Sequence, residues 1–314
     1  MYNEEWKNKF IEASNYKQST EDTIRFIFEK AGKHELEFDI DMSSMSDEQI
    51  SYVIDNIYGI SKSSFKSIKA YINSYIEWCI KNVNCTRESG ISSISPGKSA
   101  FAKFKNQMIM SPRHLQSVLD NIFDPEEMKT YDNLYRLYFW CAYSGLFESD
   151  ISNLTEENFS LETQTINFNK KEYVIYRESI PAIKNAINLH EFVYYHPNYT
   201  DSIIRPRIDG ESVFRGIKSE MNLSTFKPMS SKRISESIKD GRNNVRLSYA
   251  KIQKSGMFYR AYEDEMIGIP PSFADCAIDI AAHNGKILSE KEVYPTKQRL
   301  DGDYSLWKKV FYNT

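Results

Sequence analysis

The stretch from residue 139 to residue 155, FWCAYSGLFESDISNLT, constrains the fold of this chain more than any other. Its first part, Phe139 to Tyr143, is almost entirely apolar, which is typical of the buried end of a helix. Ser144 and Gly145 then predict a tight turn, because glycine readily adopts the left-handed backbone conformation that ends helices. The residues after the turn predict a second short helix that leads into a strand.

Composition places the chain among globular proteins with room for two domains: it has 314 residues, of which 41% are hydrophobic and 26% charged. Its four cysteines form no Cys-x-x-Cys pair, which argues against disulfides and against a structural zinc, and favours a cytoplasmic protein with reduced thiols. We expect no secretory signal, no membrane span, no metal and no cofactor. The net charge of −3 does not support nucleic-acid binding by itself, so local charge has to carry any such case. The cysteines are Cys79, Cys85, Cys141 and Cys276.

Apolar residues recur at helical spacing four times before residue 84, which predicts a small all-α bundle. The last of these helices, at about residues 63 to 81, has three lysines near its start: Lys62, Lys66 and Lys69. A solvated helix face is the simplest interpretation of these lysines, and contact with DNA is the alternative.

Between residues 86 and 111 the composition changes to that of a linker, rich in Ser, Gly and Pro. We place a domain boundary in this stretch, giving an N-terminal domain over residues 1–105 and a C-terminal domain over residues 106–314. Ser111 as the N-cap and Pro112 at the first helical position predict that the second domain opens with a helix.

The second domain is predicted to combine helices with a small sheet. Helices are expected at about 112 to 122, at about 126 to 144 and from Pro181 onward. Alternating apolar and polar residues over 164 to 176, with a polar turn between them, predict a β-hairpin. Residues 192 to 223 are expected to be irregular. The predicted fold class is therefore mainly α with a small β-sheet (α+β).

Positive charge is concentrated in residues 225 to 260, which hold nine basic residues against two acidic ones. An apolar stripe at helical spacing runs through the same segment, and that combination is typical of helices that follow a phosphate backbone. A solvated surface helix remains the alternative. The basic residues are Lys227, Lys232, Arg233, Lys239, Arg242, Arg246, Lys251, Lys254 and Arg260.

The last part of the chain predicts a helix from about Phe273 to Ala282 and a turn at Tyr294–Pro295. A terminal helix is expected from Tyr304 to Tyr312. Its apolar face could dock on its own domain or on a neighbouring subunit, and the sequence leaves both open. This face consists of Leu306, Trp307, Val310 and Phe311.

Residues 139 to 155 and the order of the domains resemble the tyrosine recombinase (phage integrase) superfamily, whose first active-site box reads roughly T/S-G-L-R-x-x-E/D-L-x-x-L. The resemblance covers nearly the whole chain and implies a helical, SAM-like core-binding domain followed by a catalytic-type α/β domain. In that family a tyrosine attacks a DNA phosphodiester. Two arginines, a hairpin lysine and His or Trp groups stabilise the transition state, because charge accumulates on its nonbridging oxygens.

The resemblance assigns family positions in the first half of the catalytic-type domain. Phe147 stands where the family has its first catalytic arginine. Asp150 matches the acidic residue that braces the site, and Lys171, or its neighbour Lys170, lies where the hairpin lysine is expected.

The second box of the family, His-x-x-Arg, resembles the segment from Asn243 to Arg246, with asparagine in place of histidine and the arginine kept. Gly256 follows the family trend after that arginine, although the spacing is about one residue short. His283 resembles the later His or Trp, and Tyr294 is the candidate for the nucleophile position, in a chain with 21 tyrosines.

Two of these departures affect the expected function. Phe147 cannot donate a hydrogen bond to a phosphate, and Asn243 cannot act as a general acid or base. The retained cations bind phosphate and do not move protons. We therefore expect no recombinase activity and treat Phe147, Asp150, Lys171, Asn243, Arg246, His283 and Tyr294 as vestigial catalytic positions.

The pattern of loss resembles the integrase-like master repressors of SPβ-group temperate Bacillus phages, which maintain lysogeny. It implies a cytoplasmic, prophage-encoded repressor that binds double-stranded operator DNA as a dimer or larger assembly and could have a protein antirepressor. DNA would be clamped between the two domains. The expected DNA-contacting residues are Lys62, Lys66, Lys69, Lys232, Arg233, Arg242, Arg246, Lys251 and Lys254.

Two other functions remain open at this point. One is an active recombinase with a rearranged site, in which Arg205 or Arg207 replaces the missing arginine and Tyr294 is the nucleophile. The other is a protein-interaction module that has lost DNA binding altogether.

Overall fold

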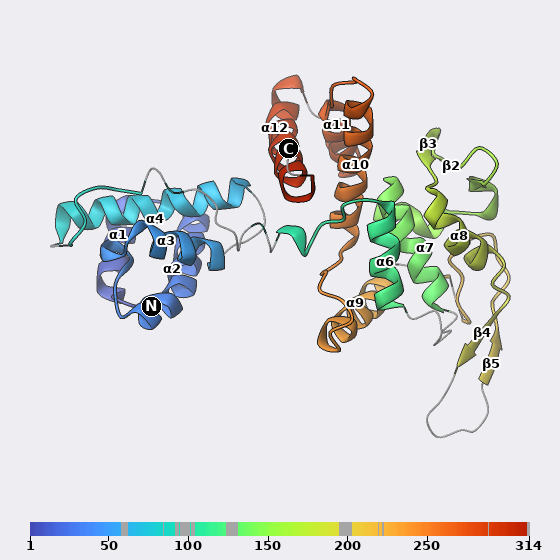
Figure 1. Cartoon of the computed structure of the whole chain (residues 1–314), viewed down its shortest axis with the longest axis horizontal. Helices are drawn as coiled ribbons and strands as arrows, with labels where there is room; N and C mark the ends of the chain where they lie inside the picture. Colours follow the sequence, from blue (N-terminus) through green and yellow to red (C-terminus); the bar gives the residue numbers. More distant parts are fainter. Residues whose placement is uncertain are drawn as a thin grey trace. The chain divides into compact units, whose positions relative to one another are not determined.

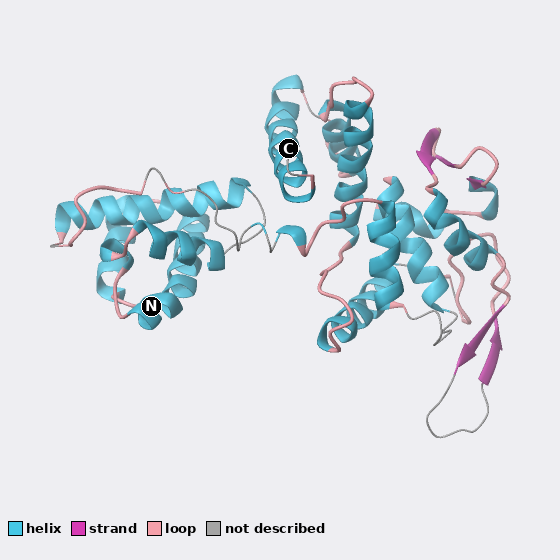
Figure 2. Ribbon diagram, viewed as in Figure 1, coloured by secondary structure: helices cyan, strands magenta, loops and turns pink. Residues whose placement is uncertain are grey.

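The computed structural model describes residues 1–57, 62–83, 85–91, 94, 101, 104–123, 131–194, 203–218, 220–221, 223–287 and 289–312, with the side chains of 62–64, 223–229 and 290 left out. Helices dominate these residues and the strands are short (Figures 1 and 2), in agreement with the predicted α+β class. The chain divides into two units. Unit 1 comprises Met1–Lys105 and Gln298–Thr314, and unit 2 comprises Asn106–Lys297.

Unit 1 contains the four helices that the apolar periodicity predicts in the first 84 residues. They surround one hydrophobic core, in which the ring centroids of Phe28 and Tyr75 lie 5.0 Å apart and those of Phe10 and Tyr75 lie 5.6 Å apart. These helices are α1 (Glu4–Ser14), α2 (Gln18–Phe38), α3 (Asp47–Ile57) and α4 (Lys62–Asn82), with the 3-10 turn η1 (Met42–Ser44) before α3.

The terminal helix is longer than the sequence predicts. Helix α12 runs over Glu290–Phe311 with Pro295 inside it, so the expected turn at Tyr294–Pro295 is wrong. The physical reason is a single buried stripe that continues on both sides of the proline. Proline removes one backbone hydrogen bond, but burial of this stripe favours a continuous helix. The stripe consists of Val293, Leu300, Tyr304 and Trp307.

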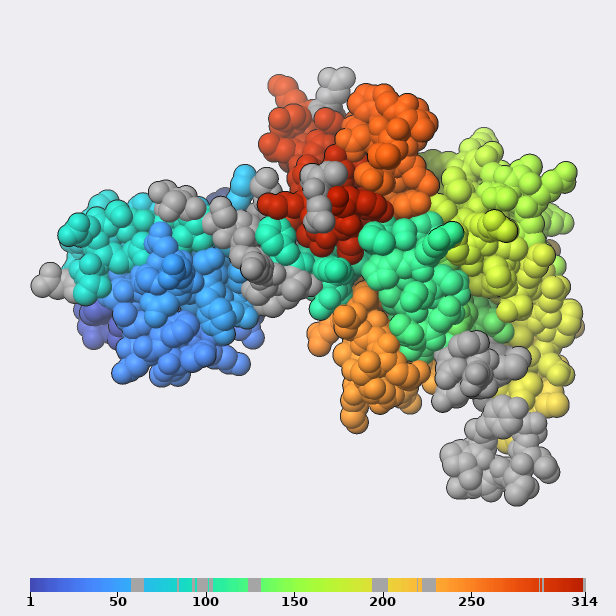
Figure 3. Space-filling view, viewed as in Figure 1, coloured from blue at the N-terminus to red at the C-terminus, as the bar shows by residue number. Residues whose placement is uncertain are grey.

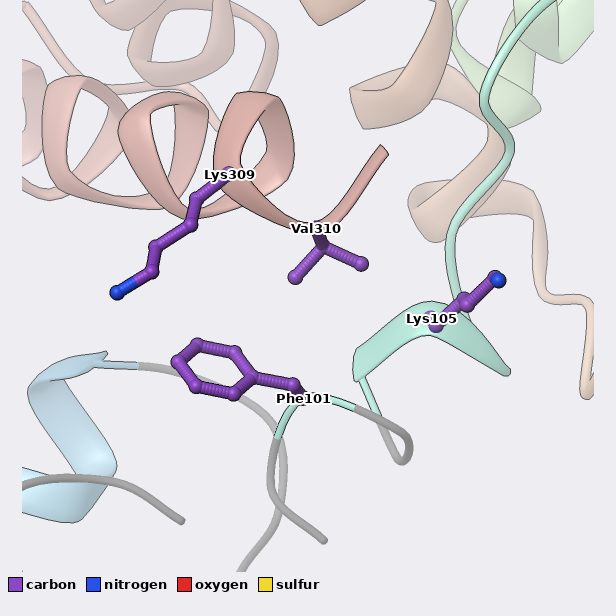
Figure 4. Close-up of a pocket in the computed structure, with 4 residues that line it drawn as sticks. All are labelled: Phe101, Lys105, Lys309 and Val310. Carbon is purple, nitrogen blue, oxygen red and sulfur yellow. The ribbon is translucent and has the colours of Figure 1, made fainter. Parts of the chain in front are cut away.

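Residues 298–314 group with unit 1, whereas the sequence placed them in a domain with residues 106–297. Within unit 1, the Lys309 ammonium lies 5.2 Å from the ring centroid of Phe101. Lys105 and Val310 join these two residues in lining an open pocket (Figure 4). The division between the units falls at Lys105 and Asn106. The difference from the predicted domains is therefore confined to residues 298–314.

Unit 2 is built around α7, most of which is buried. The Ser111 hydroxyl caps the start of α6, the helix before α7, by accepting a hydrogen bond from the His114 amide. Pro112 is the first residue of α6, as the sequence predicts. The helices of unit 2 are α6 (Pro112–Ile122), α7 (Tyr131–Ser144), α8 (Ile180–Ile187), α9 (Leu223–Lys239), α10 (Tyr249–Met266) and α11 (Ala274–His283), with 3-10 turns η2 (Glu148–Asn153), η3 (Glu156–Asn158) and η4 (Arg177–Ser179).

Two small antiparallel sheets complete unit 2. The first has strands β1 (Phe159–Ser160), β2 (Thr165–Phe168) and β3 (Lys171–Val174), and it contains the predicted hairpin. Asn169 and Lys170 form its two-residue turn with φ values of 50° and 60°, which suits a tight hairpin connection. The second sheet, β4 (Glu191–Tyr194) and β5 (Ile203–Pro206), lies in a segment that the sequence predicts as irregular.

None of the described helices is long and apolar enough to cross a membrane.

Candidate functional site

The turn after α7 carries the first box, and its geometry follows from one glycine. Gly145 has a φ of 111°, which allows the chain to leave the helix sharply. The amides of Gly145 and Leu146 both donate to the Cys141 carbonyl, at 3.2 and 3.1 Å. This closure of the helix end presents Phe147, the next residue, at the start of η2. The predicted Ser-Gly turn is therefore confirmed.

Helix α10 holds this turn from the other side. The Tyr249 hydroxyl donates to the Leu146 carbonyl at 3.0 Å, and the Gln253 amide donates to the same oxygen at 2.8 Å. Further along α10, the backbone at Gly256 approaches the Tyr143 carbonyl so closely that an added Cβ would lie 1.9 Å from the oxygen. The segment after the second box is thus packed directly on the first box.

Helix α11 supplies His283 to the same place. The imidazole stacks on the Phe147 ring with a centroid distance of 3.8 Å and an interplanar angle of 5°. Its Nε2 atom lies 2.9 Å from the Ser149 hydroxyl oxygen. Two positions that the resemblance pairs in one site are therefore in contact, and a ring-on-ring contact occupies the place expected for an arginine.

The hairpin lysine also faces α11. Lys171 Nζ lies 2.6 Å from Asp279 Oδ1, and the two side chains are 47% and 48% exposed. The hydrogen bond to Asp279 raises the pKa of Lys171, so its ammonium remains charged. The hairpin belongs to the surface of unit 2 (Figure 3). In this arrangement the ammonium is paired with a carboxylate and does not present a free charge to a phosphate.

The second box has one inward and one outward residue. The Asn243 amide is 8% exposed and folds back on its own chain: Oδ1 accepts from the Val245 amide at 2.9 Å and Nδ2 donates to the Val245 carbonyl at 2.8 Å. Arg246 is exposed, and its backbone amide is anchored on the Asn106 carbonyl at 2.8 Å. Asn243 therefore supports the loop, while the Arg246 guanidinium faces solvent.

The other positions that the resemblance assigns lie at the surface or its margin. Asp150 is half-buried beside Ser149, whose hydroxyl donates to it at 3.4 Å. Burial raises the pKa of Tyr173 on β3, and the nearby Asp150 carboxylate adds to this effect. Tyr294 lies on α12 and is 62% exposed. The contacts of the site thus connect Phe147, Ser149, Asp150 and His283, with Lys171 attached through Asp279.

The three predicted cations of unit 1 differ in their surroundings. Lys66 is exposed on α4. Lys69 donates from its ammonium to the Ile94 carbonyl at 2.7 Å, which holds the linker segment against the helix. The side chain of Lys62 lies outside the described residues. Sequence alone could not separate a lysine that contacts backbone from one that faces solvent.

In α9 and the loop after it, the predicted cations have acidic neighbours. Lys232 and Arg233 both approach Glu236 at 3.9 Å, and Arg233 also lies 3.6 Å from Asp132. Arg242 pairs with Asp240 at 3.3 Å, two residues away. The contacts with Glu236 and Asp240 are long, partly exposed and weak, so solvent or an anion could replace them at little cost. Asp132 is only 8% exposed, so loss of its contact with Arg233 would leave a buried carboxyl group.

On α10, Lys251 and Lys254 are half-buried. The Lys254 ammonium lies 5.8 Å from the ring centroid of Phe258. With Arg246 immediately before the helix, these residues place three positive charges along its first part. That arrangement can attract phosphate without positioning a group for proton transfer.

Two arginines have structural roles that sequence reasoning missed. Arg260 donates to the Tyr143 carbonyl at 2.8 Å and so neutralises the C-terminal end of α7. Arg207, proposed from sequence as a substitute catalytic arginine, is 8% exposed and donates to the Leu189 carbonyl at 2.8 Å. Burial lowers the pKa of Arg207 to about 10. Its guanidinium is committed to backbone oxygens, and Arg205 lies exposed on β5.

No three His, Cys, Asp or Glu side chains among the described residues come close enough together to hold a metal ion. The site therefore consists of one aromatic stack, one ion pair and a row of cations.

The stack of Phe147 on His283 should be measurable as a coupling energy. We expect Phe147→Leu and His283→Ala to be non-additive in the free energy of unfolding by about 0.5–1.5 kcal/mol, because each removes the same ring contact. Urea unfolding of the two single variants and the double variant measures this coupling. Ile287→Ala is the matched control, since Ile287 is 101% exposed on the loop after α11. The control pair, Phe147→Leu with Ile287→Ala, should show additive effects. Additive effects of Phe147→Leu and His283→Ala as well would contradict a stabilising stack.

Comparison with known families and structures adds one partial assignment. Residues 1–81 match the family described as "MrpR, N-terminal core-binding domain". This confirms the predicted core-binding domain for the helical part of unit 1. No curated protein matches the chain.

Solved structures of the Tn1549 transposon integrase resemble the chain weakly. One, in complex with circular intermediate DNA, has 12% identity and a TM-score of 0.36 over 85% of this chain and 88% of that chain. Another, in complex with transposon right end DNA, has 10% identity and a TM-score of 0.34 over 98% of this chain and 93% of that chain. TM-scores this low do not establish a common fold.

Proposed function

We propose that this chain binds double-stranded DNA at specific sequences and represses transcription from a prophage without cleaving the DNA. The observation that carries the proposed lack of DNA cleavage is the stack of Phe147 on His283. An apolar ring covers the imidazole where strand cleavage would require a guanidinium aimed at the phosphate. The pairing of Lys171 with Asp279 points the same way, because it reduces the positive charge that the hairpin lysine offers to a phosphate.

DNA binding is supported by the distribution of charge in each unit. Residues 1–81 match a core-binding domain, and Lys66 is exposed on its last helix. In unit 2, Arg246 precedes α10, and Lys251 and Lys254 lie in its first part. Such cations neutralise phosphates and release counterions, which favours binding to DNA of any sequence. Base contacts would then add specificity to this general affinity.

Arg246→Ala tests the DNA contact directly. We expect affinity to fall about 10- to 100-fold and the slope of log K against log salt to decrease by about one, because one charged contact to phosphate is lost. The loss should be similar for all DNA sequences. Fragments recovered from the purified protein by sequencing provide the DNA, and a salt titration of binding provides the slopes.

Lys184→Ala is the matched control for this experiment. Lys184 is an exposed cation on α8, outside the predicted DNA-contacting set. Its removal should leave affinity and salt dependence nearly unchanged. An Arg246→Ala protein with wild-type affinity would remove Arg246 from the interface, and a wild-type chain that retards no fragment at low salt would favour a protein-interaction module instead.

A further inference from the structure

In unit 1, one lysine and two carboxyl groups form a cluster that is shielded from solvent. Lys7, Glu35 and Asp41 are 0%, 0% and 5% exposed. The Lys7 ammonium lies 2.5 Å from Glu35 Oε2 and 3.7 Å from Asp41 Oδ2. With all three ionised, the cluster would carry a net negative charge in a region of low dielectric. An unbalanced buried charge is costly enough that one group of such a cluster normally changes its protonation.

Lys7 has several polar and aromatic partners in this cluster. Its ammonium donates to the Tyr2 carbonyl as well as to Glu35. It also faces the rings of Phe28 and Tyr75, with centroid distances of 5.6 and 5.8 Å. Aromatic faces stabilise a cation in a desolvated site. The excess negative charge must therefore be removed at one of the two carboxyl groups.

The hydrogen bonds distinguish the two carboxyl groups. Asp41 accepts from the Tyr75 hydroxyl on both oxygens at 3.1 Å, from the Ser43 amide at 2.9 Å and from the Asn3 side chain at 3.1 Å. These donors compensate for the burial of the Asp41 carboxyl group. Glu35 accepts from Lys7 and, at 3.0 Å, from one backbone amide, that of Met42. Glu35 is thus the group with fewer donors and full burial.

We infer that Glu35 is a proton-binding site and that loss of its proton loosens the docking of α1 on the rest of unit 1. The cluster has the right position for this role, since Lys7 belongs to α1, Glu35 to α2 and Tyr75 to α4. Deprotonation leaves two buried carboxylates facing one ammonium, and release of α1 admits water to them. The elements packed around Glu35 bring the following titratable groups: Tyr2, Lys7, Asp41, Tyr75 and Cys79, with Asp55 on α3.

The direction of the pH dependence follows from burial. Desolvation raises the pKa of Glu35 from 4.5 to about 7 against the opposing effect of Lys7. The folded state therefore binds the proton more tightly than the open state does. Proton binding at Glu35 therefore stabilises the folded state. This stabilisation is complete below about pH 4.5 and is lost as the pH rises through about 7.

Hydrogen exchange of the full chain tests the inference. Amides of Glu4–Ser14, corrected for intrinsic exchange rates, should lose about tenfold in protection between about pH 6 and about pH 8, because a proton is released on opening over that range. Amides of α8 in unit 2 serve as the internal reference. Glu35→Gln, which cannot ionise, should remove this pH dependence from α1.

Glu37→Gln is the matched control, because Glu37 lies on the same helix with its side chain 58% exposed. It should behave like the wild type. If Glu35→Gln fails to fold, carbon NMR of side-chain-labelled glutamate in the wild-type chain decides: one carboxyl should titrate near neutral pH. Protection of α1 that does not change with pH, or titration of every glutamate below about pH 6, would overturn the inference.

Discussion

A nicked DNA substrate that traps strand cleavage is expected to form no covalent adduct with this chain. Loss of one donor to a developing oxyanion typically lowers the rate by about 10²–10³, and loss of a general acid or base lowers it by a further 10²–10⁴ or so. Phe147 and Asn243 impose both losses at the corresponding positions. We therefore expect a combined reduction of about 10⁴–10⁷, which would leave no cleavage on a practical time scale.

The contacts around Phe147 also argue against obtaining strand cleavage by a single substitution. Phe147→Arg would give up the stack on His283 and place a guanidinium beside a ring that is held by Ser149. Asn243 would still be folded on Val245, and its amide cannot transfer a proton. We therefore expect Phe147→Arg to remain inactive in the same trapping assay.

The control for this assay is a second tyrosine variant, Tyr52→Phe, beside Tyr294→Phe. Tyr294→Phe and Tyr52→Phe should both behave like the wild type, since Tyr294 and Tyr52 are exposed tyrosines of which only the first is a candidate nucleophile. A covalent adduct that Tyr294→Phe abolishes and Tyr52→Phe leaves intact would overturn the absence of cleavage. It would establish the chain as an active recombinase with a rearranged site.

Gly256→Ala is expected to destabilise unit 2 by at least about 3 kcal/mol. An added Cβ would lie 1.9 Å from the Tyr143 carbonyl oxygen and 2.8 Å from its carbonyl carbon. Both atoms belong to the backbone of a buried helix end, so neither can rotate away as a side chain could. Helices α7 and α10 would have to separate, which would also strain the hydrogen bonds from Tyr249 and Gln253 to the first box.

Gly302→Ala provides the matched control, because Gly302 lies within α12 and an added Cβ there meets nothing within 4 Å. Alanine has a higher helix propensity than glycine, so this variant should gain about 0.5–1 kcal/mol in the free energy of unfolding. Urea unfolding followed by circular dichroism measures both changes. A Gly256→Ala protein with the unfolding midpoint of the wild type would show that the two helices are not in close contact at this point.

Much of the fold follows from local patterns. Ser111 and Pro112 start a helix, Gly145 ends one, and the alternation around residues 164 to 176 forms the hairpin, because each depends on neighbouring residues. The predictions that failed depended on distant packing. The buried stripe of α12 outweighs Pro295, and β4 and β5 pair across a segment whose sequence has no clear alternation.

The candidate site shows the same division. Its residues were proposed from the sequence by resemblance, but their contacts could not be predicted. Ser149 and His283 are 134 positions apart, and no local pattern predicts that the imidazole lies on the Phe147 ring or that Asp279 pairs with Lys171. Likewise, sequence ranked Lys69 and Arg207 as candidate functional cations, whereas their donors bind backbone carbonyls.

By itself, the sequence determined which chemical groups the site contains: Phe147 and Asn243 supply neither a guanidinium nor an imidazole whatever the fold does. The tertiary structure alone decided how the remaining groups are used. It covers His283 with a ring, pairs Lys171, exposes Arg246 and encloses Glu35 with Lys7. The physical reason is that side-chain chemistry belongs to each residue, while burial, pairing and charge balance depend on residues brought together from distant parts of the chain.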